Sequence, residues 1–199
     1  MDTATSLHNK NIEGAQHLLA KDYQRAANAF SDVLKADPNN AGANAGVAAL
    51  LHETGNTRAA YGYVQKAVQN DPHNVPLLGL ATKIAAKLGM FEDIKHYATK
   101  AHKLAPKSAD GIKAYLEYLE HAGDAQEIER LAGELLALDK SAETRLSAGT
   151  ALEMIGRIPE AIRIYRNAIR DVLATNSPPP PHSLKPRSFS SNPKTHYLI

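Results

Sequence analysis

The chain has 199 residues, of which 43% are hydrophobic and 22% charged, and its formal net charge is +2, values typical of an ordinary folded domain. It contains no cysteine, which excludes a disulfide framework, a thiolate zinc site and a cysteine nucleophile. All 21 acidic residues and all but three of the 23 Lys and Arg precede Asn176, so the region expected to fold has no basic surplus of the kind that nucleic acid binding needs.

The N-terminal region carries no targeting signal that we recognise. Its first twenty residues lack the positive start and the apolar run of a signal peptide. No run of about 18 apolar residues, the length of a membrane span, occurs anywhere in the sequence. We therefore expect a cytoplasmic protein without a membrane partner.

Proline and glycine recur at a fixed spacing along the chain. One set of prolines and one set of glycines each repeat every 34 residues, and the last glycine follows after 33. The residues are Pro38, Pro72 and Pro106, and Gly55, Gly89, Gly123 and Gly156. Such a period is typical of repeat architectures, and here it predicts five units.

Each unit reads as two helices. The apolar residues recur at intervals of three and four, and no alternating run is long enough for a strand. A glycine in the left-handed conformation would end the first helix, and the proline would prevent continuation of the second. We predict an all-α fold with helices at 8–19 and 23–36, 41–53 and 57–70, 75–87 and 91–103, 109–121 and 125–138, and 142–154 and 158–174.

The second helices of the first and last units carry a small residue followed four positions later by a large one. The residues are Ala26 and Phe30, with Gly14 and Tyr23 upstream, and Ala161 and Tyr165, with Gly149 and Ala168. With the 34-residue period, they resemble the tetratricopeptide repeat. Units three and four invert the size order, at Ile94 and Ala98 and at Ile128 and Ala132. The resemblance implies a right-handed superhelical solenoid over residues 7–174, after an N-terminal extension at 1–6.

The resemblance also implies a function. Such solenoids are non-catalytic scaffolds whose first helices line a concave groove that holds a peptide or helix of another protein. From the helical periodicity we expect the groove to include Asn11, Leu18, His52, Lys83, Lys87, Lys113, Glu117 and His121. Its first half is rich in small residues and the three lysines form a cationic step, so an apolar segment followed by an acidic group would fit. The alternative is that these residues are solvated helix faces.

One mode of peptide binding in the family is disfavoured. Family members that bind the terminal carboxylate of a peptide use Lys, Asn and Arg at five positions in the first three units. Those places correspond here to Asn11, Ala15, Gly46, Pro76 and Leu80, none of which matches.

We expect neither catalysis nor a cofactor. The sequence has no glycine-rich phosphate loop, nucleophile elbow or helical His-Glu-x-x-His motif. Three Glu-x3-His pairs occur, of which Glu117 and His121 face the groove beside Glu120, but two ligands do not make a catalytic zinc site. We predict no metal site. The alternative function is a targeting or substrate-recruiting module of a larger enzyme such as a transferase.

The last helix has an apolar stripe that no further unit would cover. Terminal repeats normally turn a polar face to water. Here Ala161, Tyr165 and Ala168 are expected to pack inward, which leaves Ile162, Ile169 and Leu173 where a sixth unit would dock. We expect these three residues to mediate self-association as a homodimer. The alternatives are a partner protein, the tail folding back, simple exposure, or a longer natural chain.

The composition changes after the last helix. Residues 175–199 hold four consecutive prolines, three basic residues and no acidic residue. Such a segment favours an extended polyproline conformation with no core to bury. We expect a disordered, basic spacer.

Overall fold

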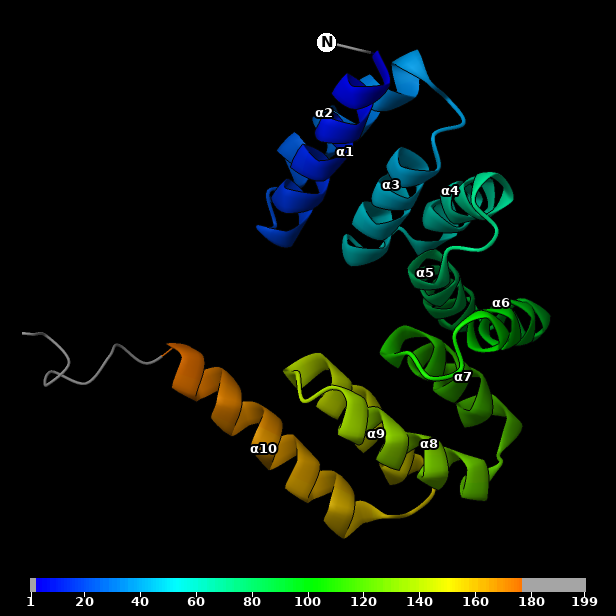
Figure 1. The fold of residues 1–199 in the computed structure, drawn as a ribbon, viewed down its shortest axis with the longest axis vertical. Coiled ribbons are helices and arrows are strands. Elements are labelled where there is room, and N and C mark those ends of the chain that lie inside the picture. The colour runs from blue at the N-terminus through cyan, green and yellow to red at the C-terminus, as the bar shows by residue number, and fades with distance from the viewer. Residues whose placement is uncertain (1–2, 177–199) are drawn as a thin grey trace, which may run out of the picture.

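The computed structural model describes residues 3–176, which form ten α-helices and, within that range, no strand (Figure 1). The helices are α1 Thr3–Leu19, α2 Tyr23–Ala36, α3 Ala41–Glu53, α4 Thr57–Asn70, α5 Val75–Lys87, α6 Phe91–Leu104, α7 Ala109–Ala122, α8 Ala125–Leu138, α9 Ala142–Met154 and α10 Ile158–Asn176. The all-α fold of five helix pairs is confirmed. The prediction of a disordered tail lies outside the described residues.

The helix bounds agree closely with those expected, except at the start of α1. Six helices match at both ends, α6 and α7 are each one residue longer than expected, and α10 ends two residues later than expected. Helix α1 begins at Thr3, five residues before the predicted start. The local sequence gives no strong helix signal there, but Leu7 packs against the buried cluster of unit one, around Phe30 and Val33. Tertiary packing therefore extends the helix beyond its sequence signals.

The turn between the two helices of a unit requires a residue in the left-handed conformation. Four glycines supply it with φ of 69° to 85°, namely Gly55, Gly89, Gly123 and Gly156, as predicted. In unit one Lys21, which lies 34 residues before Gly55, takes the same role with φ 58°. Both turns make the same bond to the residue three positions back, from Lys21 N to Leu18 O and from Gly55 N to His52 O. Unit one therefore keeps the repeat's turn without the repeat's glycine.

In units one, four and five the two helices meet at a pair of positions whose sizes compensate. In unit one Gly14 lies against the Phe30 ring, and in unit five Gly149 lies against Tyr165. At the equivalent places of unit four the large residue is Leu116 and the small one is Ala132, both buried in one cluster. In unit four the large residue is therefore on the first helix and the small one on the second, the reverse of units one and five. This exchange conserves core volume.

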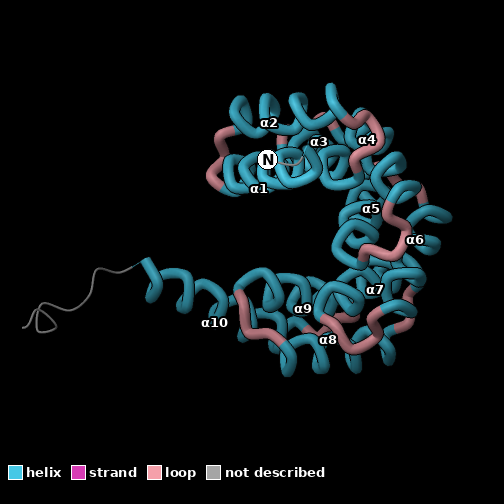
Figure 2. The backbone as a smooth tube through the Cα atoms, turned by 45° about the horizontal axis from the view of Figure 1, so that its top comes forward, coloured by secondary structure: helices cyan, strands magenta, loops and turns pink. Residues whose placement is uncertain are grey.

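The units stack into a curved solenoid. Figure 2 shows α1, α3, α5, α7 and α9 along the inner side of a C-shaped ribbon, with α2, α4, α6 and α8 along the outer side. The longer α10 packs on α9 and runs past it toward the open side. Over the described residues, no helix is long and apolar enough to cross a membrane. The first helices thus form one concave face.

Candidate functional site

The N-terminal half of the concave face holds an apolar cavity of about 620 Å³ between α1, α3 and α5. Small residues of α1 and α3 make its floor, and larger apolar side chains make its walls. Its lining includes Ile12, Ala15, Leu18, Leu19, Gly42, Ala45, Gly46, Ala49, Pro76, Leu77 and Leu80. Leu19 is 85% exposed although it is a leucine. A solvent-exposed apolar surface of this kind is typical of an interaction site.

Asn11 lines the apolar cavity but its amide group already has a structural partner. Its Nδ2 donates to Asn40 Oδ1 at 2.9 Å, and that oxygen also accepts from Ala43 N at 3.0 Å. Asn40 is the N-cap residue of α3. Asn11 therefore ties α1 to the start of the next unit.

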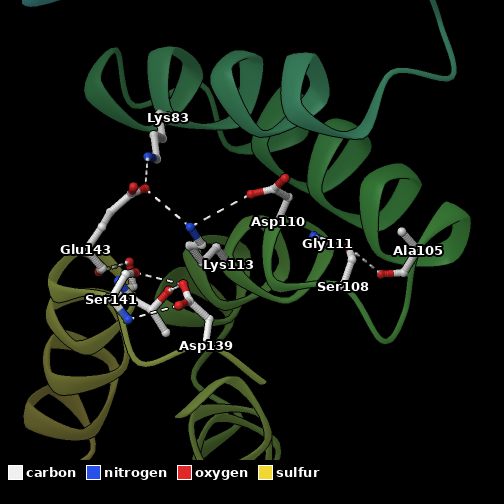
Figure 3. Close-up of polar contacts among 11 residues, drawn as sticks. Lys83, Ala105, Ser108, Asp110, Gly111, Lys113, Asp139, Ser141 and Glu143 are labelled. Atoms are coloured by element: carbon white, nitrogen blue, oxygen red, sulfur yellow. Dashed lines mark hydrogen bonds and ion pairs between the residues drawn. The ribbon is translucent and has the colours of Figure 1, made fainter. Parts of the chain in front are cut away.

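A second, charged cavity of about 160 Å³ adjoins the first and shares Pro76 and Leu80 with it. Figure 3 shows its ion pairs: Glu143 Oε1 lies 3.3 Å from Lys113 Nζ and 3.7 Å from Lys83 Nζ. Lys113 Nζ also lies 3.8 Å from Asp110 Oδ1. The expected cationic step is therefore largely neutralised by two carboxylates of its own chain.

The start of α9 is held rigidly, and this places Glu143. Asp139 accepts hydrogen bonds from the Thr144 hydroxyl and from Ser141 N and Oγ, the last two at 2.9 and 2.7 Å (Figure 3). These bonds, led by that from Thr144, lower the pKa of Asp139 to about 2. Ser141 Oγ in turn accepts from Thr144 N, which caps the helix. Glu143 follows in the first helical turn, where a negative charge is favourable.

Beyond the charged cavity the concave face becomes acidic. Glu120 is half-buried on α7, and this burial, followed by the nearby charge of Glu117, raises its pKa to about 7. Neither glutamate forms an ion pair within residues 3–176. A cation brought there by a ligand would favour the ionised form of Glu120.

The structure divides the eight expected groove residues into three groups. Asn11 and Leu18 line the apolar cavity, and Lys83, Lys113 and Glu117 line the charged cavity. The other three, His52, Lys87 and His121, lie at the C-terminal ends of α3, α5 and α7, outside both cavities. Because these helices run parallel, the three residues mark one edge of the concave face.

Sequence reasoning missed Asp110 and Glu143. Both occupy the second position of a first helix, equivalent in the repeat to Gly42 of unit two and Pro76 of unit three. Gly42 and Pro76 line the apolar cavity. The repeat register could therefore have identified the two carboxylates as groove residues.

The stripe on α10 is exposed as expected. Ile162 is 43% exposed, Ile169 60% and Leu173 63%. Ala161 and Ala168 are buried against α9, and Ile164, which sequence reasoning omitted, is buried with them. Tyr165 is only half-buried, and its hydroxyl donates to Glu153 Oε2 at 2.8 Å.

In the described part of the chain, no group of three or more His, Asp and Glu side chains could hold a metal ion. Glu117, Glu120 and His121 thus do not converge on a common point.

Comparison with known proteins shows which family part of this chain resembles. The family model described as "Tetratricopeptide repeat" matches residues 17–84. No curated protein matches the sequence. Solved structures match in fold. TTC0263, a thermophilic TPR protein of Thermus thermophilus, is 19% identical with a TM-score of 0.71 and covers 82% of this chain and 90% of its own.

Two further structures share the fold. PilF of Pseudomonas aeruginosa is 15% identical with a TM-score of 0.68, over 84% of this chain and 77% of its own. YrrB, described as a TPR protein with an unusual peptide-binding site, is 17% identical with a TM-score of 0.55, over 79% of this chain and 81% of its own.

Proposed function

We propose that the chain is a non-catalytic scaffold that binds a segment of another protein on its concave face, because residues 17–84 match the tetratricopeptide-repeat model and the fold is that of a solved protein of this kind. The observation that carries the proposal is the apolar cavity between α1, α3 and α5. A cavity of about 620 Å³ is large enough for bulky side chains of a peptide or a helix. The description of YrrB as peptide-binding supports the same use of this fold.

The apolar cavity would supply most of the affinity. Covering one large apolar side chain contributes about 1.5–3 kcal/mol, and both Leu19 and Ile12 are open to a ligand. Lys83, Lys87 and Lys113 remain the proposed contacts for an acidic group that follows the apolar segment. Such a group would have to compete with Glu143 for Lys83 and Lys113, whereas Lys87 pairs with no carboxylate of the described chain.

The test uses peptides selected on the purified protein from a random twelve-residue library, with affinity measured by fluorescence anisotropy. The variant Ala15→Glu, Leu19→Glu places two charges on exposed cavity positions. We expect it to weaken the selected peptides at least about tenfold, because each buried apolar contact is lost. The matched control, Gln24→Glu, Asn28→Glu on the outer α2, should bind as the wild type does. Equal binding by all three proteins would refute the proposal.

We also propose that the α10 stripe joins two copies of the chain. Every other second helix, α2 to α8, packs against the first helix of a following unit, whereas α10 packs on α9 alone in the described chain. Ile158, Ile162 and Ile169 stay exposed on the side that a further unit would cover. Two-fold pairing brings the same stripe of a second copy onto this face, which covers both at once.

A further inference from the structure

The outer face of α6 carries a hollow of about 540 Å³ whose lining includes three lysines. It is lined by α6, which Figure 2 shows on the outer side of the solenoid, and by the turn that follows α4. Its lining residues are His73, Glu92, Lys95, His96, Thr99, Lys100, Lys103 and Leu104. We call it the α6 hollow. Because it is on the outer side, a ligand there would not touch the apolar cavity.

The lysines of the α6 hollow have no carboxylate within ion-pair distance in residues 3–176, and all three line one hollow, whereas several other cations are paired. Arg130 pairs with Glu127 and Glu134, Arg157 with Glu129 and Glu160. Arg145 pairs with Asp171, and Lys10 and Lys35 share Asp32. By contrast, Lys95, Lys100 and Lys103 form no ion pair within residues 3–176. Their positive charge therefore faces solvent without compensation.

The carboxylates of α6 offset only part of this charge, because Glu92 alone of the two lines the hollow, beside three lysines. Both Glu92 and Asp93 lie in the first turn of the helix, where the helix dipole favours them. Asp93 is moreover engaged, since it accepts a hydrogen bond from the Tyr61 hydroxyl at 2.8 Å. Lys100 and Lys103 are three residues apart and so are neighbours on the helix surface, and Lys95 lines the same hollow nearer the start of the helix.

We propose that the α6 hollow is a second docking surface, which binds an acidic segment of a protein. Several point charges on flexible stems suit carboxylate side chains spread along a peptide, and the stems offer apolar contact as well. Nucleic acid fits less well, because no Phe, Tyr or Trp side chain lines the hollow for base stacking. The proposal goes beyond the concave groove: two surfaces on opposite sides of one solenoid hold two partners at the same time.

The probe for the test is a fluorescein-labelled ten-residue peptide of alternating Glu and Asp, titrated with the full chain at about 50 mM salt, where surface charges are weakly screened. The test variant is Lys95→Glu, Lys100→Glu, Lys103→Glu. The control is Arg25→Glu, Arg58→Glu, Lys140→Glu, which changes the net charge equally at exposed positions outside both the hollow and α10. A peptide of alternating Gln and Asn controls for contacts that do not depend on charge.

We expect the acidic peptide to bind the wild type and the control, and the α6 variant to bind it at least about tenfold more weakly, because three favourable charge contacts become repulsive. The Gln and Asn peptide should not bind. The proposal is overturned if the control variant weakens binding as much as the α6 variant does. It is also overturned if a single-stranded DNA of ten nucleotides binds the hollow more tightly than the acidic peptide at the same salt.

Discussion

Glu143 on α9 and Lys83 on α5 form an ion pair at 3.7 Å although their helices belong to units three and five and do not pack on each other. The pair spans the concave face over α7, whose Lys113 reaches the same Glu143 oxygen at 3.3 Å. Figure 3 shows the three side chains converging from three helices. The curvature of the solenoid brings them together, and their pairing in turn favours that curvature.

Replacing Glu143 with Gln should open the solenoid with little loss of stability. Lys83 and Glu143 are more than half exposed, so the free energy of unfolding should fall by less than about 1 kcal/mol. The freed lysines would repel each other, which widens the curve. Spin labels on Gln16→Cys and Arg166→Cys, in a chain that has no other cysteine, measure the change as a longer distance. An unchanged distance distribution would contradict a role for this ion pair in curvature.

Gly111→Ala should be strongly destabilising. A Cβ atom there would lie 2.2 Å from the backbone oxygen of Ala105, which has little room to move. We expect the free energy of unfolding to fall by about 1–3 kcal/mol, as in other overpacked sites. Gly133→Ala is the matched control, because nothing lies within 4 Å of its Cβ position. That change in α8 should instead stabilise the chain by about 0.5–1 kcal/mol. Urea denaturation of both variants separates the two effects.

Lys21→Gly should stabilise the protein. The left-handed conformation costs a residue with a Cβ about 1–2 kcal/mol, and the greater backbone entropy of glycine in the unfolded state offsets part of that gain. We expect a net increase of about 0.5–1 kcal/mol, seen as a higher melting temperature. The reverse change at the equivalent turn, Gly55→Lys, should lower it. If Lys21→Gly melted below the wild type, the turn of unit one would not be strained.

Glu120→Gln should change how stability depends on pH. Burial and the charge of Glu117 raise the pKa of Glu120 to about 7 from 4.5, so the folded state binds more protons than the unfolded state between these values. Its contribution to stability is therefore fully present at low pH and is lost as pH rises through 7. The variant should be more stable than the wild type at pH 8 by about 1–2 kcal/mol, a value reduced for the partial exposure of the side chain.

The comparison with the wild type matters here because other groups titrate in the same range. Burial lowers the pKa of His102, so its contribution to stability is lost as pH falls. Tyr165 and Glu117 face Glu120, but the Gln variant keeps both. The contribution of Glu120 is therefore the difference in the free energy of unfolding between the wild type and the Gln variant at each pH. A difference that does not vary from pH 5 to 8 would refute the raised pKa.

Ile162→Glu, Ile169→Glu should convert a dimer into a monomer. Both side chains are exposed on α10, so the substitutions leave the core of unit five intact. Light scattering at tens of micromolar protein gives the mass, and circular dichroism checks that the variant remains helical. A wild-type mass of a single chain at that concentration would end the hypothesis of self-association.

Turn residues and local periodicity made the helices predictable. Gly89, for instance, follows the end of α5 and Pro106 follows the end of α6, and both act through backbone conformations that depend on few neighbours. The start of α1 at Thr3 escaped prediction because it depends on Leu7 reaching a core built from another helix. Likewise, the small Ala132 departs from the repeat pattern, and the sequence of its own helix does not show that Leu116 of the paired helix fills the space.

The candidate site was predictable to the same extent. Helical periodicity put Leu18, Lys83 and Lys113 on the concave face, since each position depends on one helix and its repeat register. That Glu143 neutralises both lysines depends on how far the solenoid curves between units three and five. By itself, the sequence determined the helices, their pairing and the face each residue occupies, through interactions a few residues long. Only the tertiary structure decided which charges meet across that face, because its curvature accumulates from the packing of every unit between them.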